Sequence, residues 1–247
     1  MIHHAAQAFD QVADAYERGR PSYPADAVAH LIQTFTISSS STVLDLAAGT
    51  GKFTQLLVSS GARIIAVEPL EGMRAKLAAH NLAVEILSGS AEAVPLADAS
   101  VDVVTIAQAF HWFANERALS EIHRVLRPGG GLALIWNRRD TTQPVQQALG
   151  ALMEPYRGDV PKHRDTDWRA VFNHIRLFTT LEEWSTPHTQ EVDVPGLIDR
   201  VLSVSFMATL PPADRADVER QIRDLARDLP APITLKYTTD VYCCRAR

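Results

Sequence analysis

The chain has 247 residues, 46% of them hydrophobic, and a formal net charge of −5, which is typical of a soluble globular protein with a full core. Lys and Arg are not in excess, so a nucleic-acid partner is not expected. No apolar run reaches the ~20 residues of a membrane span, and the N-terminus lacks the basic and apolar regions of a signal peptide. Cys243 and Cys244 are adjacent and poorly placed to bridge each other, so we expect a reducing, cytoplasmic location.

The first 40 residues predict two helices that precede any strand. Apolar residues recur at helical spacing between residues 5 and 18, and Gly19 ends that helix. Two prolines keep the following link extended, and a second helix is predicted from Ala25 to about Thr36. Neither helix connects two parallel strands, so residues 1–40 are expected to form a helical lid over one sheet edge.

From residue 41, strands and helices alternate. The predicted strands are Val43–Leu46, Arg63–Glu68, Ala83–Leu87, Val101–Ala107 and Gly131–Trp136. The predicted helices between them are Lys52–Ser59, Glu71–His80 and Asn115–Leu126, the last ended by Pro128-Gly129-Gly130. This alternation predicts right-handed crossovers and a parallel sheet covered on both faces. Ligands are then expected beyond the carboxyl ends of the strands, beside the first one.

Beyond Trp136 the alternation loosens. Helices are predicted near residues 144–156, 167–173, 195–207 and 212–228, and an extended segment at 177–184. The alternating stretch Ile233–Cys243 predicts a last strand with one exposed face. We therefore divide a single structural domain into a lid (1–40), a cofactor-binding core (41–137), a helical insertion with one strand (138–230) and a C-terminal strand that completes the sheet (231–247).

The turn after the first strand is the main candidate site. Gly49 and Gly51 have no Cβ, so backbone N–H groups there can come close to a ligand. Such turns bind nucleotides, although a Gly-containing strand-to-helix turn is also an ordinary connection. Glu68 ends the second strand beside this turn, where a carboxylate can accept both hydroxyls of a ribose. The alternative is a solvated acid at a strand end.

The same turn indicates which nucleotide is bound. The dinucleotide fingerprint G-x-G-x-x-G requires glycine at position 54, where this chain has Thr54. A G-x-x-x-x-G-K-[ST] phosphate loop is also absent, because Lys52 follows Gly51 directly and precedes Phe53. A nucleoside without phosphates therefore fits better than a dinucleotide.

Several further motifs follow one another along residues 8–140. They are FDQVA (9–13) with Tyr16, RPSYP (20–24), VLDLAAGTG (43–51), VEP (67–69) with Met73, GSAEAVP (89–95), AQAFHWF (107–113) and EIHRVLRPGG (121–130). Together they resemble the class I S-adenosylmethionine-dependent methyltransferases, most closely the type 11 small-molecule group related to the ubiquinone/menaquinone and trans-aconitate methyltransferases. One position departs from the family pattern, because Ala47 stands where the family has its first glycine.

This resemblance implies a fold and a cofactor. The implied fold is α/β, with a Rossmann-like seven-stranded, mostly parallel sheet, helices on both faces, an antiparallel last strand and a helical lid. The implied cofactor is S-adenosylmethionine, with S-adenosylhomocysteine as product and no metal. The implied cofactor-binding residues are Arg20, Asp45, Ala47, Gly49, Thr50, Gly51, Glu68, Pro69, Met73, Ser90, Ala91, Glu92, Ala107 and Gln108.

Roles within this set follow the parts of the cofactor. Asp45, Ala47 and Gly49 would surround the methionine part, and Glu68 would hold the ribose. The residues that would contact the adenine are Pro69, Leu70, Met73, Ser90, Ala91 and Glu92. For Glu92 the alternative is an acid at the start of a helix.

The residues after the fourth strand are expected to surround the sulfonium. His111 has the chemistry of a general base near neutral pH, and the alternative is a structural histidine beneath the cofactor. Tyr16 and Trp112 offer aromatic faces that tolerate a cation, and Arg20 can pair with a carboxylate of the cofactor or of an acidic acceptor. We assign catalytic roles to His111 and Tyr16. The candidate substrate-binding residues are Phe110, Trp112, Asn137 and Arg138.

The predicted function is methyl transfer from S-adenosylmethionine to a small molecule, at oxygen, nitrogen or a carboxylate. The alternatives are aminocarboxypropyl transfer, cyclisation of the cofactor, or binding without catalysis. A nicotinamide oxidoreductase is disfavoured by Thr54. We expect a small-molecule substrate, no nucleic-acid or membrane partner, and a monomer or homodimer.

Overall fold

The structure is a computed structural model that describes residues 13–160 and 167–247. The chain forms two compact units. Of the described residues, the core unit comprises 23–136, 167–186 and 239–247, and the helical unit comprises 13–22, 137–160 and 187–238. The part of the first predicted helix before residue 13 lies outside the described residues.

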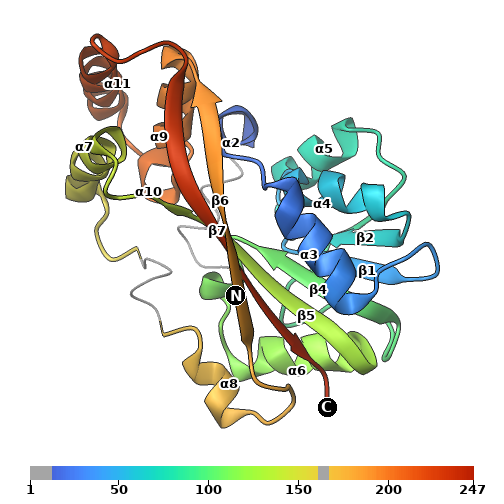
Figure 1. The fold of residues 1–247 in the computed structure, drawn as a ribbon. Helices are drawn as coiled ribbons and strands as arrows, with labels where there is room; N and C mark the ends of the chain where they lie inside the picture. Colours follow the sequence, from blue (N-terminus) through green and yellow to red (C-terminus); the bar gives the residue numbers. More distant parts are fainter. Residues whose placement is uncertain (1–12, 161–166) are drawn as a thin grey trace. The chain divides into compact units, whose positions relative to one another are not determined.

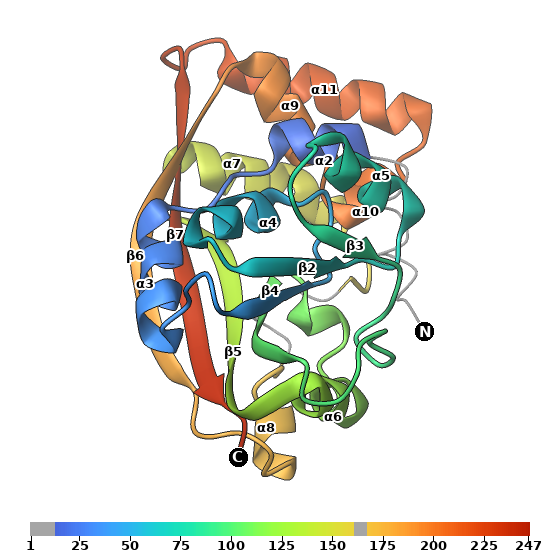
Figure 2. The ribbon, with the colours of Figure 1, turned by 90° about the vertical axis from the view of Figure 1, so that its right-hand side faces the viewer.

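One mixed sheet of seven strands has the order β3-β2-β1-β4-β5-β7-β6. The strands are β1 Thr42–Leu46, β2 Arg63–Val67, β3 Glu85–Leu87, β4 Val101–Ala107, β5 Leu126–Arg139, β6 Glu182–Val192 and β7 Ile233–Arg245. Strands β1 to β5 pair in parallel, and the last strands are antiparallel. β2, β4, β5 and β7 can be followed in Figure 2. The predicted fold class is confirmed.

Alternating side chains of the central strands give the core unit two apolar layers. Leu44 and Leu46 belong to a cluster with residues of α6 (Glu116–Val125) and α8 (Ala170–His174). Val43, directly before Leu44 in β1, belongs to a second cluster with residues of α3 (Ala25–Phe35) and α4 (Lys52–Leu57). Figure 1 shows these helices and α5 (Glu71–Ala79) around the sheet. Because both faces are covered, the central strands are mostly apolar.

The predicted end of the helix at Leu126 and the predicted start of the next strand at Gly131 are wrong. Helix α6 ends at Val125, and β5 begins at once with Leu126 instead of at Gly131. Leu126 pairs with Val101, and a register shift lets Gly131 pair with Val103. The Pro-Gly-Gly segment therefore lies in a bulge of the strand, where glycine is common.

The helical unit has its own apolar core. Its helices are α2 Ala13–Gly19, α7 Pro144–Met153, α9 Val194–Leu202, α10 Ser205–Ala208 and α11 Pro212–Ala226. Short 3-10 helices lie at Glu154–Tyr156 in this unit and at Val58–Ser60 and Phe110–Trp112 in the core unit. Leu149, Leu197 and Ile222 are buried in one cluster of this unit. A Cβ on Gly19 would lie 2.4 Å from the backbone N of Arg200, so glycine permits the close contact between α2 and α9.

Two predicted boundaries in the second half of the chain are wrong. The helix expected over 195–207 is divided at Ser203, because Val204 is extended between α9 and α10. The extended segment expected at 177–184 is instead a strand at Glu182–Val192. Pro187 lies inside this strand, and proline is tolerated there because β6 is the edge strand of the sheet.

The two cysteines provide a test of the packing of β7. Burial raises the pKa of both the Cys243 and the Cys244 thiols to about 12, so the reactive thiolate is scarce at neutral pH. We expect neither thiol of the native protein to react with a disulfide reagent near pH 8, and both to react after unfolding in urea. Rapid labelling of the native protein would contradict this packing.

None of the helices in residues 13–160 and 167–247 combines the length and the apolar character needed to cross a membrane.

Candidate active site

The turn after β1 is built from residues with left-handed backbone angles. Ala47, Gly49 and Gly51 have φ angles of 59°, 59° and 86°. A Cβ on Gly49 would meet no atom within 4 Å, whereas a Cβ on Gly51 would lie 2.2 Å from Leu77 Cδ1 of α5. Gly51 therefore allows tight packing on α5, and Gly49 leaves open space beside the backbone of the turn. Ala47 adopts a conformation that glycine adopts more easily.

Glu68 joins the ends of β1 and β2. Its side chain is 5% exposed, and its two oxygens accept hydrogen bonds from the backbone N–H groups of Gly49 and Leu70, both at 2.9 Å. Each carboxylate oxygen can accept a second hydrogen bond. The predicted position of Glu68 beside the glycine turn is therefore observed, and its carboxylate is held in one orientation.

Asp45 lies beneath the turn and is almost completely buried. Thr54 Oγ1 donates to its Oδ2 at 2.6 Å, and Thr105 Oγ1 donates to its Oδ1 at 3.0 Å. Sequence reasoning used Thr54 only to exclude a dinucleotide and missed Thr105 altogether. The alignment of Asp45 with Thr105 across parallel strands β1 and β4 brings these side chains together.

On the other side of Glu68, the predicted adenine residues follow β2 and β3. Met73 on α5 and Ala91 are buried. Arg74, which was not predicted, donates from Nη1 to the backbone oxygens of Glu68 and Pro69 at 2.9 and 2.6 Å. It therefore fixes the chain between β2 and α5.

Ser90 and Glu92 belong to the turn after β3. Ser90 and Ala93 form an antiparallel bridge, so Glu92 lies in a turn and not at a helix start. The amide of Asn115 donates to the Glu92 carboxylate at 3.3 Å. The alternative interpretation of Glu92 as a helix-start acid is therefore not supported.

Strand β4 ends at Ala107, and the next residue, Gln108, has a φ of 61°. The backbone N–H of Gln108 donates to the carbonyl of Ile135 on β5 at 2.8 Å. Phe110 is completely buried, with its ring centroid 5.8 Å from that of Phe172. Phe110 thus lies in the apolar core and not at the surface.

His111 and Trp112 stand beside each other, with ring centroids 4.8 Å apart. The indole N–H of buried Trp136 donates to His111 Nδ1 at 3.4 Å. This contact favours the neutral tautomer with its proton on Nε2. In that tautomer His111 presents a hydrogen-bond donor at Nε2 rather than the lone pair of a base.

Comparisons with known proteins identify the family of this chain. A methyltransferase domain family matches residues 44–134. An uncharacterized methyltransferase of Mycobacterium tuberculosis is 38% identical over 96% of this chain and 94% of its own length. The chain belongs to the class I S-adenosylmethionine-dependent methyltransferases.

Two further matches support the family and the fold. An uncharacterized methyltransferase-like protein of Schizosaccharomyces pombe is 38% identical, over 89% of this methyltransferase and 85% of its own length. The crystal structure of a putative methyltransferase from an antibiotic biosynthesis pathway of Anabaena variabilis is 20% identical, covers 91% of this chain and 98% of its own, and has a TM-score of 0.62. The latter shows the fold alone.

Two features of the methyltransferase suit a cofactor with polar and flat parts. The hydroxyl of Thr50 is buried and has no hydrogen-bond partner in the part of the chain that the structure describes. Gly49 adds open space where a Cβ would project. An orphan hydroxyl and an open backbone face fit the polar end of a nucleoside with an amino-acid tail.

Four predicted residues belong to the helical unit. The Arg20 guanidinium lies 4.9 Å from the Tyr16 ring centroid and donates to the backbone oxygen of Ser203 at 2.8 Å. The amide of Asn137 donates to the backbone oxygen of Ser22 at 2.8 Å. Arg138 follows it at the end of β5 and is partly buried. These contacts fix the side chains of Arg20 and Asn137.

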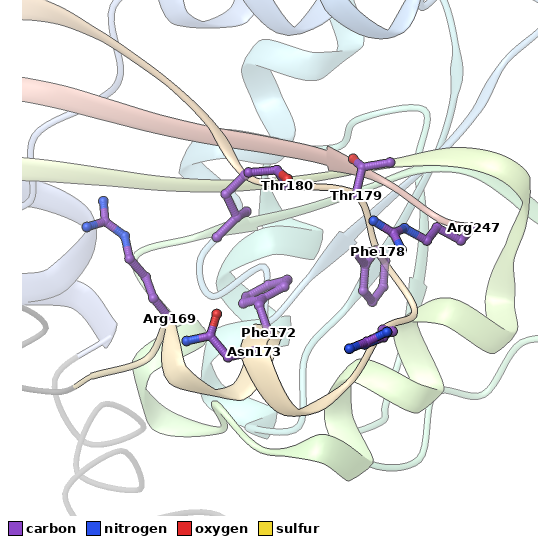
Figure 3. Close-up of a pocket in the computed structure, with 9 residues that line it drawn as sticks. Arg169, Phe172, Asn173, Phe178, Thr179, Thr180 and Arg247 are labelled. Carbon is purple, nitrogen blue, oxygen red and sulfur yellow. The ribbon is translucent and has the colours of Figure 1, made fainter.

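A separate hollow of about 430 Å³ lies in the core unit (Figure 3). It contains none of the predicted site residues. Arg169 at its rim already pairs with Glu183 at 3.0 Å. The hollow is lined by Arg169, Phe172, Asn173, Arg176, Phe178, Thr179, Thr180, Leu181 and Arg247.

No group of three or more His, Cys, Asp or Glu side chains is arranged to hold a metal ion within residues 13–160 and 167–247.

The buried carboxyl of Asp45 predicts a pH effect on the stability of the methyltransferase. Burial raises its pKa to about 6, against the opposing hydrogen bonds from Thr54 and Thr105 and with a smaller contribution from Glu68. The unfolded chain binds this proton only below about pH 4. Stability should therefore fall by about 3 kcal/mol as the pH rises from about 4 to above 6.

Urea unfolding of wild type and Asp45→Asn across this pH range tests the effect. The variant should lose this pH dependence and be more stable than wild type above pH 6, because it carries no buried charge. The same pH slope in both proteins would mean that another group titrates.

Proposed function

We propose that this enzyme transfers the methyl group of S-adenosylmethionine to a nucleophilic atom of a small molecule by in-line displacement. The observation that carries the proposal is the Glu68 carboxylate, which two backbone N–H groups hold beside the left-handed turn at Gly49. The bound cofactor supplies an activated methyl group on a positively charged sulfur. The chain must bind it, orient it and keep water away.

Glu68 is proposed to accept the two ribose hydroxyls. Its oxygens are fixed by Gly49 and Leu70 N–H groups at 2.9 Å, and charge-assisted hydrogen bonds to a fixed acceptor are strong. Pro69 and Met73 then supply apolar contacts for the adenine, and Ser90, Ala91 and Glu92 meet its edge.

The turn itself is proposed to hold the methionine part of the cofactor. The buried Thr50 hydroxyl is a ready donor for a carboxylate. Asp45 supports the turn from below through Thr54 and Thr105. Ala47, Gly49 and Ala107 keep the surface open enough for the chain of the cofactor, and Gly51 allows the turn to pack on α5.

His111 is proposed to position the acceptor rather than to remove its proton. With Nδ1 accepting from Trp136, the Nε2–H is a donor that can orient an acceptor oxygen. A nucleophile that is already ionised needs no base. Gln108 and Trp112 complete this mouth, and Tyr16, Asn137 and Arg138 of the helical unit are proposed to contact the acceptor.

Product analysis tests the proposal. The pure protein is incubated with S-adenosylmethionine, with and without a pool of small metabolites, and the nucleoside products are identified by mass spectrometry. We expect S-adenosylhomocysteine that depends on the pool. Methylthioadenosine instead would favour the two alternatives in which another carbon of the sulfonium is attacked. An aminocarboxypropyl group on an acceptor would then indicate transfer, and a cyclic aminocarboxypropyl fragment would indicate cyclisation.

A further inference from the structure

The helical unit contains a buried arginine that forms no ion pair with the acids that the structure describes. Arg200 of α9 is 6% exposed, and its Nε donates to the hydroxyl of Tyr237 at 3.0 Å. Its Nη1 is buried and has no hydrogen-bond partner among the residues that the structure describes. A buried guanidinium with an unused donor is costly unless an anion binds to it.

A second arginine lies in the same place. Arg139 ends β5, and the only hydrogen bond of its side chain among the described residues is a weak one, from Nη1 to Met153 Sδ at 4.0 Å. Burial lowers the pKa of Arg139 well below its ordinary value, and the nearby charges of Arg200, Arg20 and Arg157 lower it further. Positive charges therefore lie near Arg139, and no described carboxylate is among the charges that shift its pKa.

Two acids of the helical unit pair with other arginines. Asp199, next to Arg200 in the chain, accepts from Arg18 at 2.6 Å. Glu154 accepts from Arg157 at 3.0 Å. Neither Arg139 nor Arg200 forms an ion pair within the described part of the chain.

A hydrogen-bond chain fixes Arg200. The Tyr237 hydroxyl accepts from Arg200 and donates to Gln190 Oε1 at 3.2 Å. The Gln190 amide in turn donates to the backbone oxygen of Gly19 at 3.0 Å. Every link is a neutral group, so the chain orients the guanidinium but does not compensate its charge. Such preorganisation is typical of a binding site.

We propose that Arg139 and Arg200 bind an oxyanion group, a carboxylate or a phosphate, of the acceptor. The planar guanidinium matches the geometry of both groups. The acceptor is favoured because Asn137 and Arg138, which are proposed to contact it, directly precede Arg139 on β5. Calling the occupant the acceptor rests on the proposed methyl transfer, whereas the anion site rests on the arginines alone.

Binding of simple anions tests the site without turnover. Full-length protein, alone and saturated with S-adenosylhomocysteine, is titrated with succinate, with inorganic phosphate and with neutral succinamide, at constant ionic strength set by sodium chloride. We expect succinate or phosphate, but not succinamide, to raise the melting temperature by at least about 5 °C at a hundredfold excess over its Kd.

Two variants assign this effect to the arginines. Arg139→Met and Arg200→Met should each weaken anion binding at least about 30-fold, and each should melt higher than wild type without anion, because a buried charge is removed. The control is Arg215→Met on α11, an exposed arginine that pairs with Glu219. It should bind the anion as wild type does.

Three results would overturn the proposal. One is that neither succinate nor phosphate binds to wild type. Another is that the Arg139 and Arg200 variants bind the anion with the affinity of wild type and have lower melting temperatures. The third is a loss of affinity for S-adenosylhomocysteine alone, which would assign the arginines to the carboxylate of the cofactor. Failure of the methyl-transfer proposal is separate, because anion binding is measured without a reaction.

Discussion

Glu68→Gln should weaken the binding of S-adenosylhomocysteine by about 100-fold or more, measured by isothermal titration calorimetry. The variant loses the negative charge that would accept the ribose hydroxyls, and each charge-assisted hydrogen bond contributes about 1.5–3 kcal/mol. In wild type, both oxygens of Glu68 accept hydrogen bonds, from the backbone N–H groups of Gly49 and Leu70. In the variant, the amide NH₂ group replaces one of these oxygens and faces a backbone N–H group that it cannot accept from.

Glu85→Gln is the matched control. Glu85 begins β3, and its half-exposed side chain pairs with Arg63 at 2.7 Å on the surface, so its loss should change affinity very little. Melting curves of both variants separate a loss of binding from a loss of folding. Unchanged affinity in folded Glu68→Gln would refute the ribose assignment.

Gly51→Ala should mainly reduce stability, whereas Gly49→Ala should mainly weaken cofactor binding. Gly51→Ala places a Cβ 2.2 Å from Leu77 Cδ1 at a φ of 86°, and we expect it to lose about 2–4 kcal/mol of stability. Gly49→Ala meets no atom within 4 Å at a φ of 59°, so it should lose only about 1–2 kcal/mol. Its methyl group projects into the open space proposed for the cofactor and should weaken binding strongly.

Each glycine variant is the control for the other. Urea unfolding gives the free energy of unfolding, and calorimetry with S-adenosylhomocysteine gives the affinity of the folded protein. Equal stability losses would show that Leu77 adjusts without cost. Tight binding by Gly49→Ala would place the cofactor away from this turn.

Much of the sheet could be predicted because its strands are buried on both faces. An apolar run that ends at an acid, such as Arg63–Glu68, carries a clear signal, and β4 was predicted to the residue. The relation of Glu68 to Gly49 also follows from sequence, since parallel neighbouring strands end at one edge of the sheet. The longer strands β5 and β6 were harder, because a bulge and an internal proline interrupt their patterns.

Side-chain partners could not be read from the chain order. Thr105 contacts Asp45 only because β4 pairs with β1, and Trp136 reaches His111 from β5. Arg139 and Arg200 are 61 positions apart in the chain, and each alone resembles an ordinary surface arginine. Only the fold of the helical unit brings their charges together.

The central claim is methyl transfer, and the most direct measurement follows the methyl group itself. The enzyme is incubated with S-adenosylmethionine carrying a deuterated methyl group and with a pool of small molecules, and both product classes are analysed by mass spectrometry. The account predicts unlabelled S-adenosylhomocysteine and an acceptor that carries the label. A label that stays in methylthioadenosine, with no labelled acceptor, would contradict it.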